Sequence, residues 1–358
     1  MLLVFCTLAL RESDFNHCVC TGWGEICIFA GMRTEIAAIG KWNMIEKLLA
    51  LSGMEASSTV IEGKGGQCSC SHAILLEGVD FDLVYTPLRH LGYKAVLYVL
   101  GDLYASLRTP EALSVNLGLS KRFCYEDVEA LWQGMVAACG EHGVKRISLD
   151  LNPSVNGLCI SLSALGSQKK KVLDSIPQTK NMDLICLTGH VGAAYMGLHI
   201  LEREKVAFTS TNVQPELEKY KAVLGSYLSP EIRPNVIGRF IDAGCLPSQG
   251  FFVTRGLGEA VLRLVKKTGF GAKLYLDKIP ISSQTFAVAE ELNMDAITAA
   301  MNGGDDYRFI FTVPLEKHEV IRHDFQDYDI IGHTAKPEVG AVMVTPEGAE
   351  LEIRAQGF

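Results

Sequence analysis

Apolar residues recur along the chain at two periods, one typical of helices and one typical of strands. The segment CYEDVEALWQGMVAACGEHG, 124–143, has apolar side chains at i, i+3, i+4 and i+7, acidic residues at its start and glycine at its end. This pattern predicts an amphipathic helix. The run TPLRHLGYKAVLYVLGDLYASL, 86–107, has a proline near its start and predicts a mostly buried helix. Further helices are predicted at 36–51, 214–226, 230–243, 257–268 and 283–301.

Strands are predicted where apolar residues alternate or form short runs between turn residues. ALSVNLGL, 112–119, alternates as a half-buried strand does, and the strand-like runs VKRISLDL and GLCISLSAL follow it. HAILLEGVDFDL, 72–83, combines a strand with a turn, and MDLICLTGHVGAAYMGLHILERE predicts strand, glycine turn and helix. The stretch 53–72 is rich in Ser, Gly and Cys without a period, which predicts a loop. Further strands are predicted at 272–276, 307–313, 328–333 and 340–345.

The length of 358 residues favours two domains, because it exceeds the usual size of one hydrophobic core. The polar segment SQKKKVLDSIPQTKN, 167–181, is either the linker between them or an exposed hairpin arm. The predicted units are an α+β domain at 32–166 and an α/β domain at 167–358. Residues 1–31 are interpreted as an atypical extension, since the opening MLLVFCTLAL is too short to span a bilayer and lacks a basic start.

Composition narrows the classes of partner and compartment. A net charge of -8 and a pI near 5.6 argue against a nucleic-acid or anionic-membrane surface, which needs concentrated Lys and Arg. The 11 cysteines are odd in number and scattered through predicted core elements, which favours free thiols in a reducing cytoplasm. Cys18/Cys20 and Cys68/Cys70 with His72 are alternatives as soft-metal ligands, although Cys-x-Cys lacks the two-residue spacer of common zinc sites.

Several stretches together carry a family resemblance: MRTEIAAIG, LLEGVDFDLVYTPLRHLGYKAV, GDLYAS, LDLNPSVNG, DLICLTGHVGAAYMGL, AMNGGDDYRFIFTVP and IIGH. In this order and spacing they resemble the thiamine-monophosphate kinases, within the aminoimidazole-ribonucleotide synthetase-like superfamily. The resemblance implies an N-terminal α/β domain that pairs across a homodimer into a barrel-like sheet, followed by a C-terminal α/β domain. It also implies ATP-dependent phosphorylation of thiamine monophosphate to the diphosphate, with several Mg²⁺ ions.

The chain has no GxxxxGK[ST] segment, so metal-binding aspartates are expected to organise the phosphates. Asp102, in GDLYAS, aligns with the family's Ser-Asp-Leu metal ligand; the alternative is a solvated residue at a helix end. Asp150, in ISLDLNPS, matches the aspartate of the family's Gly-Gly-Asp-Thr; the alternative is an Asx turn with Asn152. Asp102 and Asp150 are therefore the predicted catalytic and metal-binding residues.

The segment NGGDDYRFIF matches the family's Gly-Gly-Glu-Asp-Tyr-Glu, which lines the substrate end of the cleft. Gly303, Gly304, Asp305, Asp306 and Tyr307 are accordingly predicted to bind substrate, with both acids facing a cationic thiamine and its metals. Taken without the resemblance, the same residues would form a tight turn before an edge strand, with both aspartates in solvent.

Glycine turns supply the predicted nucleotide-binding positions. Gly189 and Gly192 open a helix whose N-terminal amides could face a phosphate. His190 stands where the family often has an acid and is interpreted as a surface turn residue. The other predicted nucleotide-binding positions are Gly63, Lys64, Gly65, Thr254 and Arg255.

Three departures from the family remove carboxylates. Residues 61–70 read IEGKGGQCSC in place of a Gly-Asp-Asp-Ala-Ala loop, and the family's Thr-Asp falls on His72 and Ala73. The family's Asp-Ile-Ser-Asp-Gly-Leu becomes FVTRGL, so that Phe252 and Arg255 replace acids. Lys64 and Arg255 could neutralise phosphates directly, or they could be a solvated loop residue and an arginine paired with a nearby acid.

Three functions remain open from the sequence. The first is a thiamine-monophosphate kinase-like enzyme in which several metal-binding aspartates are missing. The second is a catalytically inactive homologue that acts as a nucleotide-binding or regulatory dimer. The third is another activity of the superfamily, such as formation of an acyl or seleno phosphate near GKGGQC, against which the kinase-like C-terminal segment argues.

Overall fold

The computed structural model describes residues 39–52, 60–63, 65–212 and 215–355. The predicted extension 1–31 lies outside these residues. Helix α2 (Lys41–Leu51) belongs to a small unit that is described by itself, and it confirms most of the helix predicted at 36–51. Residues 55–356 form the second unit, which contains both sheets. Within the described part of the chain, every helix is too short or too polar to cross a membrane.

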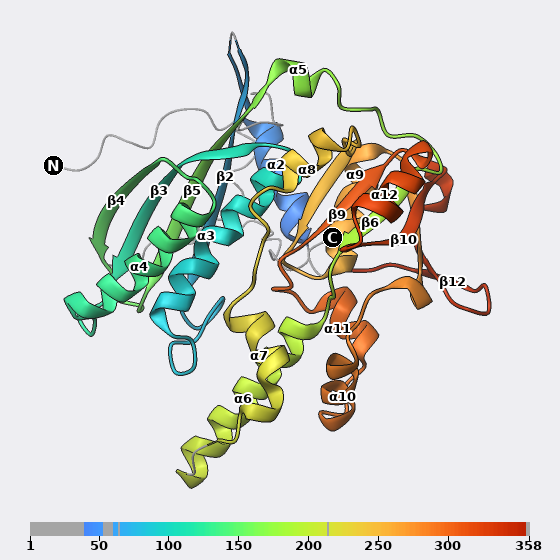
Figure 1. The fold of residues 1–358 in the computed structure, drawn as a ribbon. Coiled ribbons are helices and arrows are strands. Elements are labelled where there is room, and N and C mark those ends of the chain that lie inside the picture. Colours follow the sequence, from blue (N-terminus) through green and yellow to red (C-terminus); the bar gives the residue numbers. More distant parts are fainter. Residues whose placement is uncertain (1–38, 53–59, 64, 213–214, 356–358) are drawn as a thin grey trace, which may run out of the picture. The chain divides into compact units, whose positions relative to one another are not determined.

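A five-stranded sheet forms the first half of the large unit, in the order β1-β2-β5-β3-β4 (Figure 1). Only the β3–β4 pair is parallel. The strands are β1 (Val60–Gly63), β2 (Gly66–Leu76), β3 (Thr109–Leu119), β4 (Arg146–Pro153) and β5 (Cys159–Lys169). These bounds confirm the strands predicted at 112–119, VKRISLDL and GLCISLSAL.

The predicted loop at 53–72 is wrong where the structure describes it. Val60–Gly63 and Gly66–Leu76 form a hairpin, with Gly63 opposite Gly66. Along its whole length β2 pairs with β5, from Gly66 opposite Lys169 to Leu76 opposite Cys159. Local residue preference does not predict this strand, because its partner strand lies about ninety residues further along the chain and the pairing outweighs the preference.

Two helices cover one face of this sheet. Helix α3 (Leu88–Ala105) packs against β2, β5 and β3, and α4 (Tyr125–Glu141) packs against α3, as predicted for both segments (Figure 1). Alternate residues of β3, such as Leu113, Val115 and Leu117, are almost fully buried under these helices. The other face carries Ser114 and Asn116, and β4 is exposed along its whole length.

The second sheet has seven strands in the order β12-β11-β8-β10-β6-β9-β7. They are β6 (Leu184–Thr188), β7 (Gln249–Val253), β8 (Gly271–Tyr275), β9 (Arg308–Val313), β10 (Tyr328–Ala335), β11 (Ala341–Val344) and β12 (Glu350–Glu352). The predicted strands are confirmed, and β7 and β12 are additional. With the first sheet and its helices, this arrangement confirms the predicted α+β and α/β fold class.

The helices of this half agree with the prediction in type more than in length, except for α5 and α12, which were not predicted. They are α5 (Lys170–Leu173), α6 (Ala193–Thr211), α7 (Lys221–Leu228), α8 (Val236–Asp242), α9 (Leu257–Thr268), α10 (Ser283–Glu291), α11 (Ala296–Asn302) and α12 (His318–Asp324). Short 3₁₀ turns occur at Glu218–Tyr220, Leu276–Lys278, Leu315–Lys317 and Pro337–Val339. The predicted helix 283–301 is divided, because Asn293 is left-handed (φ 53°) and Asp295 caps α11.

One apolar core joins the two sheets. It contains residues of β3 and β5, such as Val115 and Leu162, together with Phe252 of β7 and Phe311 of β9. Gly101 of α3 lies against Phe252, since a Cβ at this glycine would be 2.3 Å from the ring. The sheets are therefore packed through α3, and this packing determines which loops of the two halves meet.

Candidate functional site

A cavity of about 580 Å³ lies where loops of both halves meet around α3, and we call it the main cavity. Its walls come from the loop after β2, one side of α3, the start of α6, α7, and the two turns 254–255 and 302–307. Leu91, Lys94 and Tyr98 of α3 line it, which is the i, i+3, i+7 spacing of one helix face. The mostly apolar run 91–100 thus presents a lysine and a tyrosine to the main cavity.

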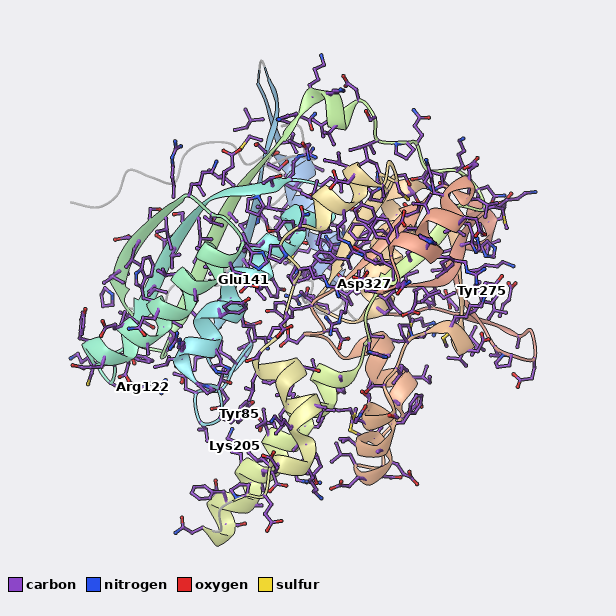
Figure 2. All side chains as sticks on the ribbon, viewed as in Figure 1. Tyr85, Arg122, Glu141, Lys205, Tyr275 and Asp327 are labelled. Atoms are coloured by element: carbon purple, nitrogen blue, oxygen red, sulfur yellow. The ribbon has the colours of Figure 1, made fainter. Side chains whose placement is uncertain are left out.

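One end of the main cavity is held by a network of charged and aromatic side chains. Lys205 Nζ lies 2.5 Å from Asp82 Oδ2 and 3.6 Å from Glu202 Oε2, and the Tyr85 hydroxyl donates to Glu202 at 2.5 Å. Figure 2 shows Tyr85 and Lys205 close together, with Nζ 5.8 Å from the ring centroid. Burial alone would raise the pKa of Asp82, but hydrogen bonds from Lys205 and the Val84 amide lower it overall. Asp82 is therefore ionised at neutral pH.

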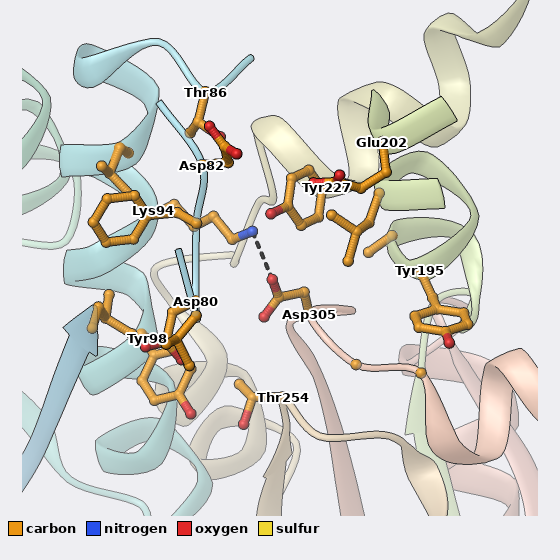
Figure 3. Close-up of a pocket in the computed structure, with 18 of the residues that line it drawn as sticks. Asp80, Asp82, Thr86, Lys94, Tyr98, Tyr195, Glu202, Tyr227, Thr254 and Asp305 are labelled. Atoms are coloured by element: carbon orange, nitrogen blue, oxygen red, sulfur yellow. Dashed lines mark hydrogen bonds and ion pairs between the residues drawn. The ribbon is translucent and has the colours of Figure 1, made fainter. Parts of the chain in front are cut away.

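Lys94 and Asp305 form an ion pair across the middle of the cavity (Figure 3). The Nζ–Oδ2 distance is 2.8 Å, and the Lys94 side chain is only 8% exposed. The ammonium also lies 3.8 Å from the ring centroid of Tyr227 and 5.8 Å from that of Tyr307. A cation so far from water needs its carboxylate partner, because removing one member of a buried pair is strongly destabilising. Asp305 is therefore fixed in the cavity wall by Lys94.

The turn 302–307 has a backbone that few side chains tolerate. Gly304 (φ 137°), Asp305 (φ 59°) and Tyr307 (φ 53°) all have positive φ. The Asp305 and Tyr307 amides donate to the carbonyls of Thr254 and Val253, which ties the turn to the end of β7. A Cβ at Gly304 would be 2.9 Å from the Thr254 carbonyl oxygen, so glycine is required there. Two non-glycine residues with positive φ mark stored strain of the kind concentrated at functional sites.

Six of the predicted site residues come together at the main cavity. They are Thr254, Arg255, Gly303, Gly304, Asp305 and Tyr307. The Tyr98 hydroxyl interacts with Thr254 and Arg255; burial raises its pKa, and the charge of Arg255 opposes this rise in part.

Asp306, predicted to face the substrate beside Asp305, is not among the residues that line the main cavity. Its Oδ1 accepts a hydrogen bond of 2.9 Å from the Gly192 amide at the start of α6. The side chain is 5% exposed, and desolvation raises its pKa to about 7. The two acids therefore do not face one ligand, because the left-handed backbone at Asp305 (φ 59°) and Tyr307 (φ 53°) directs the neighbouring side chains to different cavities.

At the helix start predicted to face a phosphate, the Gly192 amide already has a protein partner. Gly192 is left-handed (φ 84°), and its N–H is already bonded to the carboxylate of Asp306. A Cβ at Gly189 (φ 59°) would be 3.0 Å from Arg308 Nε, so this glycine accommodates an arginine side chain. His190 is exposed, as expected of a turn residue. The predicted phosphate site at this turn is therefore corrected to a carboxylate-capped helix start.

The glycines predicted to bind nucleotide after residue 60 lie in the β1–β2 hairpin. Gly63 ends β1, and Gly65 is exposed in the turn and is not among the residues that line the main cavity. Lys64 lies outside the described residues. Gly66 (φ 155°) approaches β5 closely, since a Cβ there would be 2.0 Å from the Gln168 carbonyl oxygen. These glycines shape a hairpin and give the described chain no phosphate loop.

Asp102 and Asp150 lie at opposite ends of the first sheet. Asp102 is in the last turn of α3, shortly before β3 begins at Thr109. Asp150 pairs in register with Asn116 of β3. Asn116 lies seven residues beyond Thr109, the first residue of β3, which is about 23 Å along the strand at roughly 3.3 Å per residue. The Asp150 carboxylate accepts from the Leu151 amide and from Asn152 Nδ2, which is the alternative noted from the sequence. Within one chain these two carboxylates are therefore not neighbours, and their shared role at a metal ion stays a prediction.

A Mg²⁺ site of the expected kind does not fit the side chains present. Among the described residues, no group of three or more His, Cys, Asp or Glu could hold a metal ion, and this includes Cys68, Cys70 and His72. Phe252, which the resemblance implies replaces a family acid, is buried in the core, and Arg255 brings a fixed cation to the cavity wall. The charge-neutralising groups of the main cavity are basic side chains.

Sequence reasoning missed four charged residues of the main cavity, three on helices and Asp82 in the loop after β2. Lys94, Asp82, Glu202 and Lys205 all line the main cavity, yet none was singled out. Lys94 did leave a signal, because it is the one lysine in the apolar run 91–100 and a buried ammonium requires a partner. Nothing in the sequence distinguished Glu202 and Lys205, since charged residues are common on exposed helix faces.

The first sheet matches the family model described as AIR synthase related protein, N-terminal domain, over residues 56–167. Thiamine-monophosphate kinase of Rhodopirellula baltica is 24% identical over 71% of this chain and 71% of its own length. Thiamine-monophosphate kinase of Aquifex aeolicus is 23% identical over 88% of this chain and 97% of its own length.

Solved structures share the fold at still lower identity. The complex of AaThiL with AMPPCP and TMP superposes with a TM-score of 0.77 at 19% identity, covering 91% of this chain and 99% of that one. The hydrogenase maturation protein HypE of E. coli superposes with a TM-score of 0.61 at 16% identity, covering 88% of this chain and 98% of that one. Both structures establish the fold that the motifs implied.

Proposed function

The chain is a divergent relative of the thiamine-monophosphate kinases, which confirms the family predicted from its motifs, and we propose that its main cavity binds thiamine monophosphate. The observation that carries this proposal is the convergence of the motif segments. LLEGVDFDLVYTPLRHLGYKAV and NGGDDY, more than 200 residues apart, line one cavity of about 580 Å³. This volume is within the usual range for small-molecule sites, roughly 300–1,000 Å³.

The charges of the main cavity suit a ligand with a cationic and an anionic end. Its lining includes four carboxylates, Asp80, Asp82, Glu202 and Asp305, against three cations. The thiazolium ring would pack against a partly exposed tyrosine of the cavity wall, such as Tyr195, because cations are attracted to the ring quadrupole. The three cations, Lys94, Lys205 and Arg255, are the candidate partners of phosphate oxygens.

In the proposed reaction, ATP donates its γ-phosphoryl group to the phosphate of thiamine monophosphate. Such transfers depend mainly on positioning and on neutralising charge. The tyrosines would orient the substrate, Asp305 would hold the cationic ring, and Arg255 would neutralise phosphate charge. The Mg²⁺ ions that the family resemblance implies are assigned no residues here, because the predicted ligands Asp102 and Asp150 lie apart.

A second candidate is a catalytically inactive homologue that binds a nucleotide or thiamine phosphate as a regulatory dimer. Two positions favour it, because Phe252 and Arg255 occupy sites where the family carries carboxylates. Phe252 is 1% exposed and packs on Gly101 of α3, so its place in the fold is structural.

The remaining proposals concern the whole chain. We propose a homodimer formed through the uncovered face of the first sheet, because β4 is exposed and Ile74 of β2 is 58% exposed on that face. The predicted domains 32–166 and 167–358 and a cytoplasmic location belong to the same proposal. The seven cysteines in the described residues are all free, which supports a reducing compartment.

Product analysis distinguishes the two candidate functions. The full chain is incubated with ATP, thiamine monophosphate and either Mg²⁺ or EDTA, and thiamine diphosphate is quantified by chromatography. The kinase proposal predicts diphosphate formation that Arg255→Ala lowers at least tenfold, while the exposed Arg322→Ala on α12 leaves it unchanged. An absence of product at saturating substrates, together with measurable binding of thiamine monophosphate, would instead establish the inactive homologue.

A further inference from the structure

A second cavity, of about 240 Å³, lies on the other side of the segment Asp305–Arg308. Asp305 and Tyr307 line the main cavity, whereas Asp306 and Arg308 line the second one. The first turn of α6, one side of α7 and the residues before α10 complete its walls. A single segment of four residues thus supplies side chains to two separate cavities.

Arg308 contributes a guanidinium that lacks an acidic partner. Its Nε donates to the His190 carbonyl oxygen at 3.1 Å, which fixes the side chain. Within the described residues, neither terminal nitrogen has a hydrogen bond, and no carboxylate lies within 4 Å of the group. Burial lowers the pKa of Arg308, although the group remains a cation. A half-buried guanidinium with two unused nitrogens is a fork that matches the two oxygens of a carboxylate.

Asp306 contributes the opposite charge without pairing with Arg308. Its Oδ1 accepts from the Gly192 amide, while its Oδ2 is buried and, in the part of the chain that the structure describes, has no hydrogen-bond partner. Leaving a buried carboxylate oxygen unbonded costs free energy, so a ligand that donates to it would be stabilised. The two charges line the same cavity and remain more than 4 Å apart, which leaves room for a ligand between them.

We propose that the second cavity binds a small carboxylic acid carrying an amino or hydroxyl group on the neighbouring carbon. The carboxylate pairs with the terminal nitrogens of Arg308, and the adjacent N–H or O–H donates to Asp306 Oδ2. Ala193, Ala222 and Val223 form an apolar wall that accepts a short side chain.

The size of the cavity limits the ligand to this class. A volume of about 240 Å³ is below the usual range for drug-sized ligands, so nucleotides and thiamine phosphates are too large. An acid without the neighbouring donor leaves Asp306 Oδ2 unbonded, and an amine without a carboxylate leaves Arg308 uncompensated. The site therefore discriminates by requiring both groups on one small molecule.

Saturation-transfer NMR and calorimetry on the full chain test this proposal. L-Alanine and L-lactate are the probes, with acetate and ethylamine as ligands that each lack one of the two groups. Saturable binding of at least one probe is expected, with both single-group ligands at least tenfold weaker. Arg308→Gln is expected to bind the probe at least tenfold more weakly than the wild type. The exposed Arg322→Gln is expected to bind it with unchanged affinity.

A second variant protects the test against misfolding of Arg308→Gln. Ala222 is exposed on α7, where leucine is a good helix former, so Ala222→Leu should fold and obstruct the cavity. This variant is expected to bind the probe at least tenfold more weakly, with an unchanged affinity for thiamine monophosphate. Failure of both probes to saturate, or binding that survives in Ala222→Leu, would overturn the assignment.

Discussion

At the scale of single residues, the sequence Asp-Asp-Tyr-Arg shows how neighbouring side chains take different roles. Asp305 pairs with Lys94 in the main cavity, while Asp306 caps α6 and lines the second cavity. The two like charges are therefore separated by the backbone between them, which reduces their repulsion. The prediction of a shared ligand placed both acids on one side, because the left-handed conformations of Asp305 and Tyr307 are not visible in the sequence.

Asp306 makes the stability of the protein depend on pH. Its folded pKa of about 7 lies above the unfolded value of roughly 3.9, because desolvation outweighs the hydrogen bond from the Gly192 amide. Its contribution to stability is complete below about pH 4 and is lost as the pH rises toward 7. Asp306→Asn removes this ionisation and keeps an oxygen for the Gly192 amide. Denaturant unfolding at several pH values should show that the free energy of unfolding of the variant rises relative to that of the wild type between pH 4 and 7.

The charged neighbours of Asp306 act in opposite directions on its pKa. Arg308 lowers it and Asp305 raises it, both less than burial does. Asp329→Asn, an exposed substitution on β10, provides the control and should show no such trend. A difference between Asp306→Asn and the wild type that stays constant from pH 4 to 7 would show that Asp306 does not titrate in this range.

At the scale of elements, α3 and α4 are joined by a close contact between glycines and backbone. A Cβ at Gly92 would be 2.0 Å from the Leu131 carbonyl oxygen, and one at Gly134 would be 1.9 Å from that of Arg89. Such an approach is possible only without side chains, and it positions the face of α3 that carries Lys94. The geometry of the main cavity therefore depends on glycines outside it.

Two alanine substitutions on α4 test this contact. Gly134→Ala should destabilise the fold by about 1–3 kcal/mol or more, because the helices must separate. Gly140→Ala, on the same helix with nothing within 4 Å, should stabilise it by up to about 1 kcal/mol. Chemical denaturation measures both changes. Equal effects of the two substitutions would contradict the close packing of α3 and α4.

The elements predicted correctly are those whose pattern is strong within one segment. The 3.6-residue period of α4 and the alternation of β3 identify them without any partner. The strand β2 could not be predicted in the same way, because its Gly, Ser and Cys residues become a strand only by pairing with β5. The division of 283–301 depended on the left-handed Asn293, whose conformation is not visible in an apolar pattern.

At the scale of the whole molecule, the main cavity is assembled from segments between Leu75 and Tyr307. The motifs predicted which turn would line it, but the carboxylates predicted to share a metal ion lie far apart along the first sheet. Helix faces contribute Lys94, Glu202 and Lys205, and these depend on tertiary packing that a single sequence does not contain. The family resemblance therefore predicted the fold more completely than the chemistry of the site.

The most direct test of this account is calorimetric titration of the full chain with thiamine monophosphate. The wild type and Asp329→Asn are expected to bind with equal affinity. Asp305→Asn is expected to bind about tenfold more weakly, a loss of about 1.4 kcal/mol, because the cationic ring loses its carboxylate. If the wild type does not bind thiamine monophosphate, or if Asp305→Asn binds it as well as the wild type does, the assignment of the main cavity is wrong.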